Sequence, residues 1–103
     1  MMAAPAEDPR IVGLLAIVLE HGPARVWLFG SRGQLTHQPG SDIDFAVEGV
    51  TTAQWPILDS RLRENDITLL PIDLVRWEDA HPLLKAAVES TGRLLYERVG
   101  VPA

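Results

Sequence analysis

The stretch from Val26 to Val47 constrains this chain most, because it places acidic residues inside an apolar run. It reads as an apolar strand, a glycine and a serine, a short polar segment, and then Asp42-Ile43-Asp44 within a second apolar run. An ionised carboxylate in an apolar setting costs many kcal/mol unless a positive partner compensates it. No basic residue lies close by on that run, so a bound metal ion is the simplest compensation.

Length and composition indicate one small globular domain. The chain has 103 residues, of which 47% are apolar and 22% are charged. The absence of cysteine excludes disulfides and thiolate metal sites and fits a reducing compartment, so we expect a cytoplasmic protein. The sequence shows no signal peptide, and no apolar run approaches the ~18 residues of a membrane span. The net charge of −5 argues against direct nucleic-acid binding but is compatible with one nucleotide whose phosphates a metal neutralises.

Apolar periodicity and turn residues predict alternating helices and strands. Asp8 is a candidate N-cap with Pro9 in the first turn, and Gly22-Pro23 ends this first helix. Ser31 is expected to cap a short helical turn after the first strand. The other predicted elements are strands at 25–29, 42–48 and 72–75, a helix from Thr51 or Thr52 to Asn65-Asp66, a helix from Pro82 to Thr91 capped by Asp79 or His81, and an edge strand or helical turn at 93–98.

This order of elements, with short connections, argues for an α/β fold in which helices pack against a small mixed β-sheet. No internal repeat, low-complexity tract or linker interrupts it. We therefore expect one domain over residues 8–99, between an N-terminal tail at 1–7 and a C-terminal tail at 100–103.

Asp42 and Asp44 are candidate metal ligands. Side chains alternate along a strand, so both carboxylates leave one face, about 7 Å apart at their bases, while Ile43 and Phe45 enter the core. Oxygen ligands without His or Cys favour Mg²⁺ or Mn²⁺. Asp73, in another apolar strand, makes a three-carboxylate site plausible, where it holds a metal or acts as a general base on an incoming hydroxyl. The alternative is that these are strand-end aspartates facing water.

Gly30-Ser31 is the candidate phosphate-binding turn. A glycine between a strand and a helical start lets backbone N–H groups approach a phosphate closely. The Ser31 hydroxyl can donate to a phosphate oxygen, and Arg32 can add charge-assisted hydrogen bonds. Taken alone, a Gly-Ser pair after a strand is most often structural.

The spacing of these two candidates carries a family resemblance. Gly30-Ser31, ten intervening residues and Asp42-Ile43-Asp44 resemble the GS-x10-DxD motif of the DNA polymerase beta-like nucleotidyltransferase superfamily. The chain resembles the minimal nucleotidyltransferase family in particular, over about residues 10–98. Four segments carry this resemblance: FGSR, SDIDFAV, PIDLVRWED and TGRLLYER. The resemblance implies the polymerase beta-like nucleotidyltransferase fold.

The resemblance also implies roles for residues. Gly30 and Ser31 would hold the phosphates of a nucleoside triphosphate, Asp42 and Asp44 would bind Mg²⁺, and Asp73 would be the third carboxylate. The reaction would transfer AMP from ATP to a hydroxyl and release pyrophosphate. Members of this family act as antitoxins of HEPN-domain ribonuclease toxins, so the resemblance implies a tyrosine of such a toxin as the acceptor. The chain is expected to form a homodimer or a hetero-oligomer with its partner.

The chain departs from the family motif at one place, and two alternative functions stay open. Family members often read G-S-R-A-R-G, whereas this chain has Gly33-Gln34 at the fourth and fifth positions, and this bears on triphosphate affinity more than on metal binding. The chain could instead be a non-catalytic binding module that neutralises its partner by covering it. It could also be a subunit of a small-molecule, aminoglycoside-type transferase.

Overall fold

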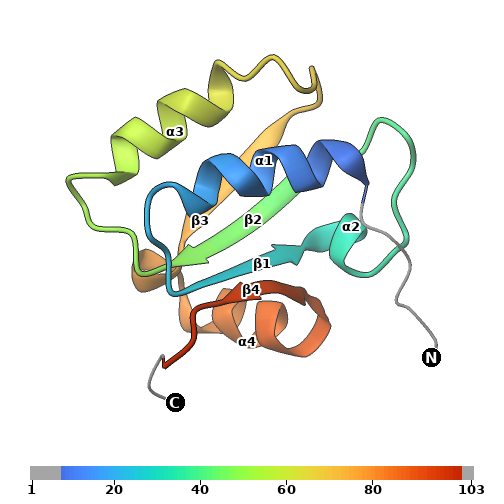
Figure 1. The fold of residues 1–103 in the computed structure, drawn as a ribbon. Coiled ribbons are helices and arrows are strands. Elements are labelled where there is room, and N and C mark those ends of the chain that lie inside the picture. The colour runs from blue at the N-terminus through green and yellow to red at the C-terminus, as the bar shows by residue number, and fades with distance from the viewer. Residues whose placement is uncertain (1–7, 101–103) are drawn as a thin grey trace.

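β1 (Arg25–Phe29) is the strand around which the sheet is built. It pairs antiparallel with β2 (Ile43–Glu48) on one side and with β4 (Arg93–Glu97) on the other. β3 (Ile72–Arg76) adds to β2 in parallel, so the order is β3-β2-β1-β4 (Figure 1). The predicted mixed sheet is confirmed, and the segment at 93–98 forms an edge strand rather than a helical turn.

The structure is a computed structural model, and it describes residues 8–100. The predicted tail at 1–7 and residues 101–103 of the predicted C-terminal tail lie outside the described residues. None of the helices within the described range is long and apolar enough to cross a membrane.

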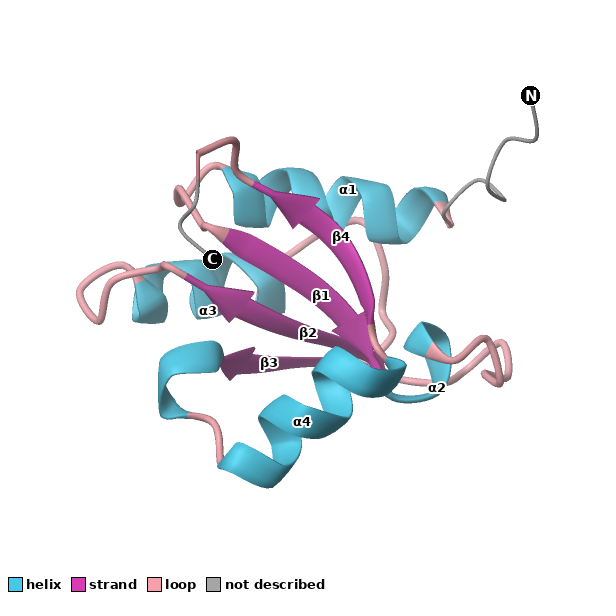
Figure 2. Ribbon diagram, turned by 90° about the horizontal axis from the view of Figure 1, so that it is seen from below, coloured by secondary structure: helices cyan, strands magenta, loops and turns pink. Residues whose placement is uncertain are grey.

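Helices cover both faces of the sheet. α1 and α3 lie on one face and α4 lies on the other, where it crosses the sheet and ends beside α2 (Figures 1 and 2). The helical elements are α1 (Pro9–Leu19), α2 (Gly30–Gly33), α3 (Trp55–Arg63), the 3-10 turn η1 (Trp77–Asp79) and α4 (Pro82–Thr91).

Strand alternation divides the core into two layers. On β1, Val26 and Leu28 are fully buried in the larger layer, under α1 and α3. Trp27 points the other way, into the smaller layer with Val88 of α4. There its ring stacks on Trp77, with 4.4 Å between centroids.

The predicted caps of α1 and α4 are confirmed. The Asp8 carboxylate accepts a hydrogen bond from the Arg10 backbone N–H at 2.9 Å, and His81 Nδ1 accepts one from Leu83 N at 3.0 Å. These bonds satisfy backbone donors that have no partner within the helix.

Several boundaries differ from the prediction, among them the end of α3, which is at Arg63 rather than at Asn65-Asp66. Ser31 is not a cap, because α2 already begins at Gly30, with Phe29 as its N-cap. α3 begins only at Trp55, since Thr51 Oγ1 instead accepts from Gln54 N at 3.2 Å and closes a turn before the helix. β2 begins at Ile43, so Asp42 precedes the strand rather than lying in it.

Asp8 generates a prediction on stability in acid. The hydrogen bonds from the Arg10 side chain and backbone hold the pKa of Asp8 at about 2, below its usual 3.8. A carboxyl with a lowered folded-state pKa stabilises the fold above its unfolded pKa and loses that contribution as the pH falls from about 3.8 to about 2. Its side chain is 26% exposed, so solvent screening limits the contribution to below about 1 kcal/mol.

We expect Asp8→Asn, which keeps a capping oxygen, to unfold more easily than the wild-type chain at pH 6 and equally easily near pH 2. Urea unfolding across that pH range measures the difference. A constant difference at all pH values would contradict the assignment.

Candidate functional site

The register of the sheet brings two of the predicted carboxylates together. Asp44 on β2 pairs with Phe29 on β1 and with Asp73 on β3. Paired residues of neighbouring strands point to the same face, and the strands lie about 4.8 Å apart. Asp44 and Asp73 therefore leave the sheet side by side, on the face of α4. Ile43 and Phe45 are fully buried on the other face, as the alternation predicted.

The three carboxylates are less buried than the sequence predicted. Asp44 is half-buried, whereas Asp42 and Asp73 are exposed. Asp42 precedes its strand, and Asp73 lies on β3, which is an edge of the sheet. The cost of desolvation thus falls mainly on Asp44.

Like charges raise that cost further. Burial raises the pKa of the Asp44 carboxyl, and the charges of Asp73 and Asp42 raise it more. Within residues 8–100, none of the three carboxylates forms an ion pair or a side-chain hydrogen bond. A divalent cation is the kind of ligand that would relieve this repulsion, and carboxylate oxygens suit Mg²⁺ or Mn²⁺.

The three aspartate side chains do not converge on a common point at which a metal ion could bind. In the described part of the chain, no group of three or more His, Cys, Asp or Glu side chains is arranged to hold a metal ion. Donor chemistry and charge therefore fit a hard divalent cation, while coordination by all three aspartates requires their side chains to turn toward one another.

Gly30 joins the phosphate-binding candidate to the carboxylates. Its φ is +68°, a conformation that L side chains rarely adopt. A Cβ built on Gly30 would collide with Oδ2 of Asp44. The Asp44 carboxylate thus packs against the backbone of the turn, so the two predicted halves lie in contact. Ser31 follows directly and is half-buried.

Arg32 has a different place from the one predicted. We expected it to contact a phosphate, but its side chain is only 2% exposed. Its Nε donates to the carbonyl of Ser41 at 3.1 Å and its Nη2 to that of Pro39 at 3.3 Å. Its Nη1 also lies 3.9 Å from the Asp8 carboxylate. Arg32 therefore holds the segment that leads into Asp42, a role that no local sequence pattern indicates.

Gly33 explains one departure from the family pattern. A Cβ on this residue would lie 2.5 Å from the carbonyl oxygen of Leu28 and 3.5 Å from the Cα of Gly92. The close approach of α2 to β1 and to the end of α4 therefore excludes alanine at this position. Gln34, at the position of the missing second arginine, is exposed.

Arg63 is a site neighbour that the sequence reading missed. Its side chain is exposed and paired with Asp59, with 3.0 Å from Nε to Oδ2. The Asp59 hydrogen bond raises the pKa of Arg63, and the charge of Asp73 adds to the effect. The cation thus lies within electrostatic reach of the third carboxylate, which only the packing of α3 beside β3 could reveal.

Comparisons with known proteins found one family model and several similar solved structures. The family model described as polymerase beta, nucleotidyltransferase matches residues 16–99. A chain of the crystal structure of a toxin–antitoxin with AMP-PNP is 26% identical and superposes with a TM-score of 0.64, over 91% of this chain and 76% of that one. A chain of the toxin–antitoxin MntA-HepT superposes with a TM-score of 0.63 at 21% identity, over 89% and 74% of the two chains, and shows the fold alone. No curated protein matches significantly.

Gly30→Ala should disrupt the site as well as the fold, and Gly22→Ala is its matched control. The two glycines have φ values of +68° and +69°, but a Cβ on Gly22 meets nothing within 4 Å. We expect Gly22→Ala to lower the free energy of unfolding by about 1–2 kcal/mol, the cost of this backbone conformation. Gly30→Ala should cost about 1–3 kcal/mol more, because Asp44 must move.

Urea unfolding of both variants measures the difference, and Mn²⁺ titration reports the site. We expect the Mn²⁺ affinity of Gly30→Ala to fall and that of Gly22→Ala to stay unchanged. Equal losses of stability in the two variants would show that Asp44 is not held against Gly30.

Proposed function

The chain belongs to the polymerase beta nucleotidyltransferase family, and from that membership we propose that it transfers AMP from ATP to a hydroxyl group of a partner protein. The observed mixed sheet with helices on both faces is the fold that this family implies. The observation that carries the proposal is the contact of the Asp44 carboxylate with Gly30 on one side and its register with Asp73 on the other. The candidate phosphate turn, a half-buried carboxylate and an exposed carboxylate are therefore neighbours, which supports the proposal.

We assign the steps of the proposed reaction to these neighbouring residues. Gly30 and Ser31 take the triphosphate at the start of α2, directly after β1, where the Asp44 carboxylate packs against the Gly30 backbone. Asp42, Asp44 and Asp73 would hold Mg²⁺, which neutralises phosphate charge and polarises the reacting oxygens. Arg32 keeps the segment before Asp42 in place.

Asp73, at the sheet edge, faces the incoming acceptor. Its carboxylate takes the proton of the acceptor hydroxyl, acting as a general base. The acceptor oxygen forms a bond to the α-phosphorus of ATP while the bond from that phosphorus to the bridging β-phosphate oxygen breaks. Pyrophosphate leaves on the opposite side, so positioning in line supplies much of the rate.

The comparisons support a toxin as the partner. The matching chains come from toxin–antitoxin structures, one of them solved with AMP-PNP. We propose that this chain is the antitoxin and that a tyrosine of a HEPN-domain ribonuclease is the acceptor. Direct binding to nucleic acid is not part of the proposal, given the net charge of −5.

A second candidate function is neutralisation by binding alone. It is favoured by the open arrangement of the carboxylates and by the engagement of Arg32 in loop contacts rather than at the phosphate turn. In that case the carboxylates are dispensable and complex formation blocks the toxin.

Asp73→Asn separates the two functions. We expect it to lower AMP transfer about 10²–10⁴-fold, because Asn cannot accept the hydroxyl proton. AMP transfer is measured by incubating the chain with radiolabelled ATP, Mg²⁺ and a HEPN-domain partner protein. Mass spectrometry then identifies the modified residue. Glu64→Gln, an exposed acid at the end of α3, should transfer normally. Toxin neutralisation that survives Asp73→Asn without AMP transfer would favour binding alone.

Metal binding has its own test through stability. In chelator, we expect Asp44→Asn to be more stable than the wild type, because it removes a half-buried charge beside two like charges. Mg²⁺ at 100 times its Kd should stabilise the wild type by about 2.7 kcal/mol and leave Asp44→Asn almost unchanged. Thermal unfolding with and without Mg²⁺ measures both effects. The exposed Asp66→Asn should behave as the wild type, and a Mg²⁺ response retained by Asp44→Asn would contradict the assignment.

A further inference from the structure

Gly92-Arg93 joins α4 to β4 beside α2, the short helix that begins at the candidate phosphate turn (Figure 2). Gly92 N donates to the carbonyl of Val88 at 2.8 Å and so ends α4. A Cβ on Gly92 would lie 2.5 Å from that carbonyl oxygen and 3.2 Å from the carbonyl oxygen of Leu28 on β1. Glycine is therefore needed for the chain to turn from α4 into β4 this close to the end of β1.

Arg93 contacts α2 from this position. It pairs with Leu28 across the sheet, and its Nη2 donates to the carbonyl of Arg32 at 3.3 Å. That carbonyl lies near the end of α2, where the carbonyls of a helix accept hydrogen bonds from donors outside it. The first residue of β4 thus binds the backbone of the helix that contains Ser31.

Arg32 extends this connection to the segment before Asp42. Its buried guanidinium donates to the carbonyls of Pro39 and Ser41 and lies 3.9 Å from the Asp8 carboxylate. Burying a charge is costly unless polar partners compensate it, so a shift of this segment would leave the charge without compensation. A planar guanidinium that binds two carbonyls fixes both the position and the direction of the segment.

Asp42 depends on the segment before it. Asp44 and Asp73 lie in strands whose pairing fixes them, whereas Asp42 precedes β2 and is exposed. Residues 34–40 are exposed as well, so they give the segment little packing against the domain. The hydrogen bonds from Arg32 therefore have a large part in placing Asp42.

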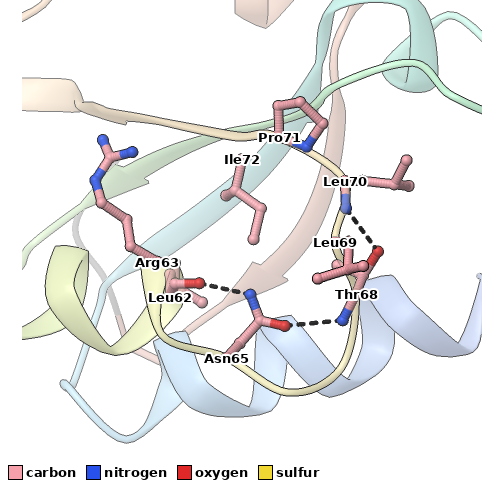
Figure 3. A pocket seen from close by; sticks show the side chains of 8 residues that line it. All are labelled: Leu62, Arg63, Asn65, Thr68, Leu69, Leu70, Pro71 and Ile72. Atoms are coloured by element: carbon pink, nitrogen blue, oxygen red, sulfur yellow. Dashed lines mark hydrogen bonds between the residues drawn. The ribbon is translucent and has the colours of Figure 1, made fainter.

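The loop that leads into β3, by contrast, is held by side chains of its own (Figure 3). Asn65 Oδ1 accepts from Thr68 N at 2.9 Å, and Thr68 Oγ1 accepts from Leu70 N at 3.1 Å. In the segment before Asp42, a side chain from another element, Arg32 of α2, makes the corresponding bonds to the backbone. The position of Asp42 thus follows the position of α2.

We propose that Arg93 is a positioning residue of the transferase site and acts through Arg32. Its hydrogen bond to the Arg32 backbone holds α2, and the Arg32 side chain holds the segment before Asp42. The candidate phosphate turn and the candidate metal ligand thereby keep a fixed relation. In-line transfer requires that relation, since a misplacement of about 1 Å can cost about 10²-fold in rate. The inference rests on the proposed function and adds to it a residue that acts from outside the site.

Arg93→Met tests the positioning role, and Arg25→Met is its matched control. Arg25 lies about 17 Å along β1 from Gly30 and joins β1 to the neighbouring strands, with bonds to Glu48 at 2.7 Å and Glu97 at 2.6 Å. The measurements are the Kd of Mn²⁺ by calorimetry and the Tm of each variant. We expect both variants to lower the Tm, since each loses hydrogen bonds between elements.

Only Arg93→Met should raise the Kd of Mn²⁺, about three- to tenfold, which is the effect of one lost hydrogen bond. Arg93→Lys keeps a donor for the Arg32 carbonyl, so its Kd should stay within about twofold of the wild-type value.

The positioning role is overturned by an unchanged Kd for Arg93→Met, or by a wild type that binds no Mn²⁺. An equal rise of the Kd in Arg93→Met and Arg25→Met also overturns it, because Arg93 then only stabilises the fold. A Kd for Arg93→Lys as high as that of Arg93→Met would show that the hydrogen bond to α2 is not responsible.

AMP transfer to a HEPN-domain partner protein, measured in parallel, keeps the positioning role separate from the proposed function. Transfer by the wild type with an unchanged Kd for Arg93→Met leaves the function standing and removes the positioning role. A Kd raised in Arg93→Met alone, without transfer by the wild type, supports the hold of Arg93 on Asp42 and contradicts the transferase.

Discussion

The contact between the Asp44 carboxylate and the backbone of Gly30 is the constraint on which the site depends. It exists because β1 and β2 pair antiparallel, which brings the end of one strand against the start of the other. Only glycine both adopts the φ of +68° and leaves room for the carboxylate. A candidate phosphate turn and a candidate metal ligand, Gly30 and Asp44, which are fourteen positions apart in the sequence, therefore touch.

The same arrangement carries a cost in stability. Asp44 is half-buried beside Asp42 and Asp73, and its pKa is raised by burial and by both neighbours. A chain selected only for stability would not place three like charges at one end of a sheet. Such local conflicts with the rules of folding are characteristic of functional sites, where a ligand supplies the missing compensation. Here the missing partner is positive, which supports the proposed binding of a divalent cation.

Sequence reasoning succeeded where the responsible interactions are local. The strand at Arg25–Phe29, the capped start of α1 and the stop of α4 at Thr91 were predicted correctly, since each depends on neighbouring residues. It failed where the position of a side chain depends on residues that are distant in the sequence. Arg32 was expected at a phosphate, yet it binds carbonyls of Pro39 and Ser41.

The sequence by itself predicted that Asp42, Asp44 and Gly30-Ser31 belong to one functional unit, because their residue types and spacing are specific. It also determined the mixed α/β architecture, through the alternation of apolar periods. Only the tertiary structure decided that Asp73 stands directly beside Asp44, since strand register depends on long-range pairing. It alone also brought Arg63 within electrostatic reach of Asp73, because the packing of α3 against β3 leaves no local mark in the sequence.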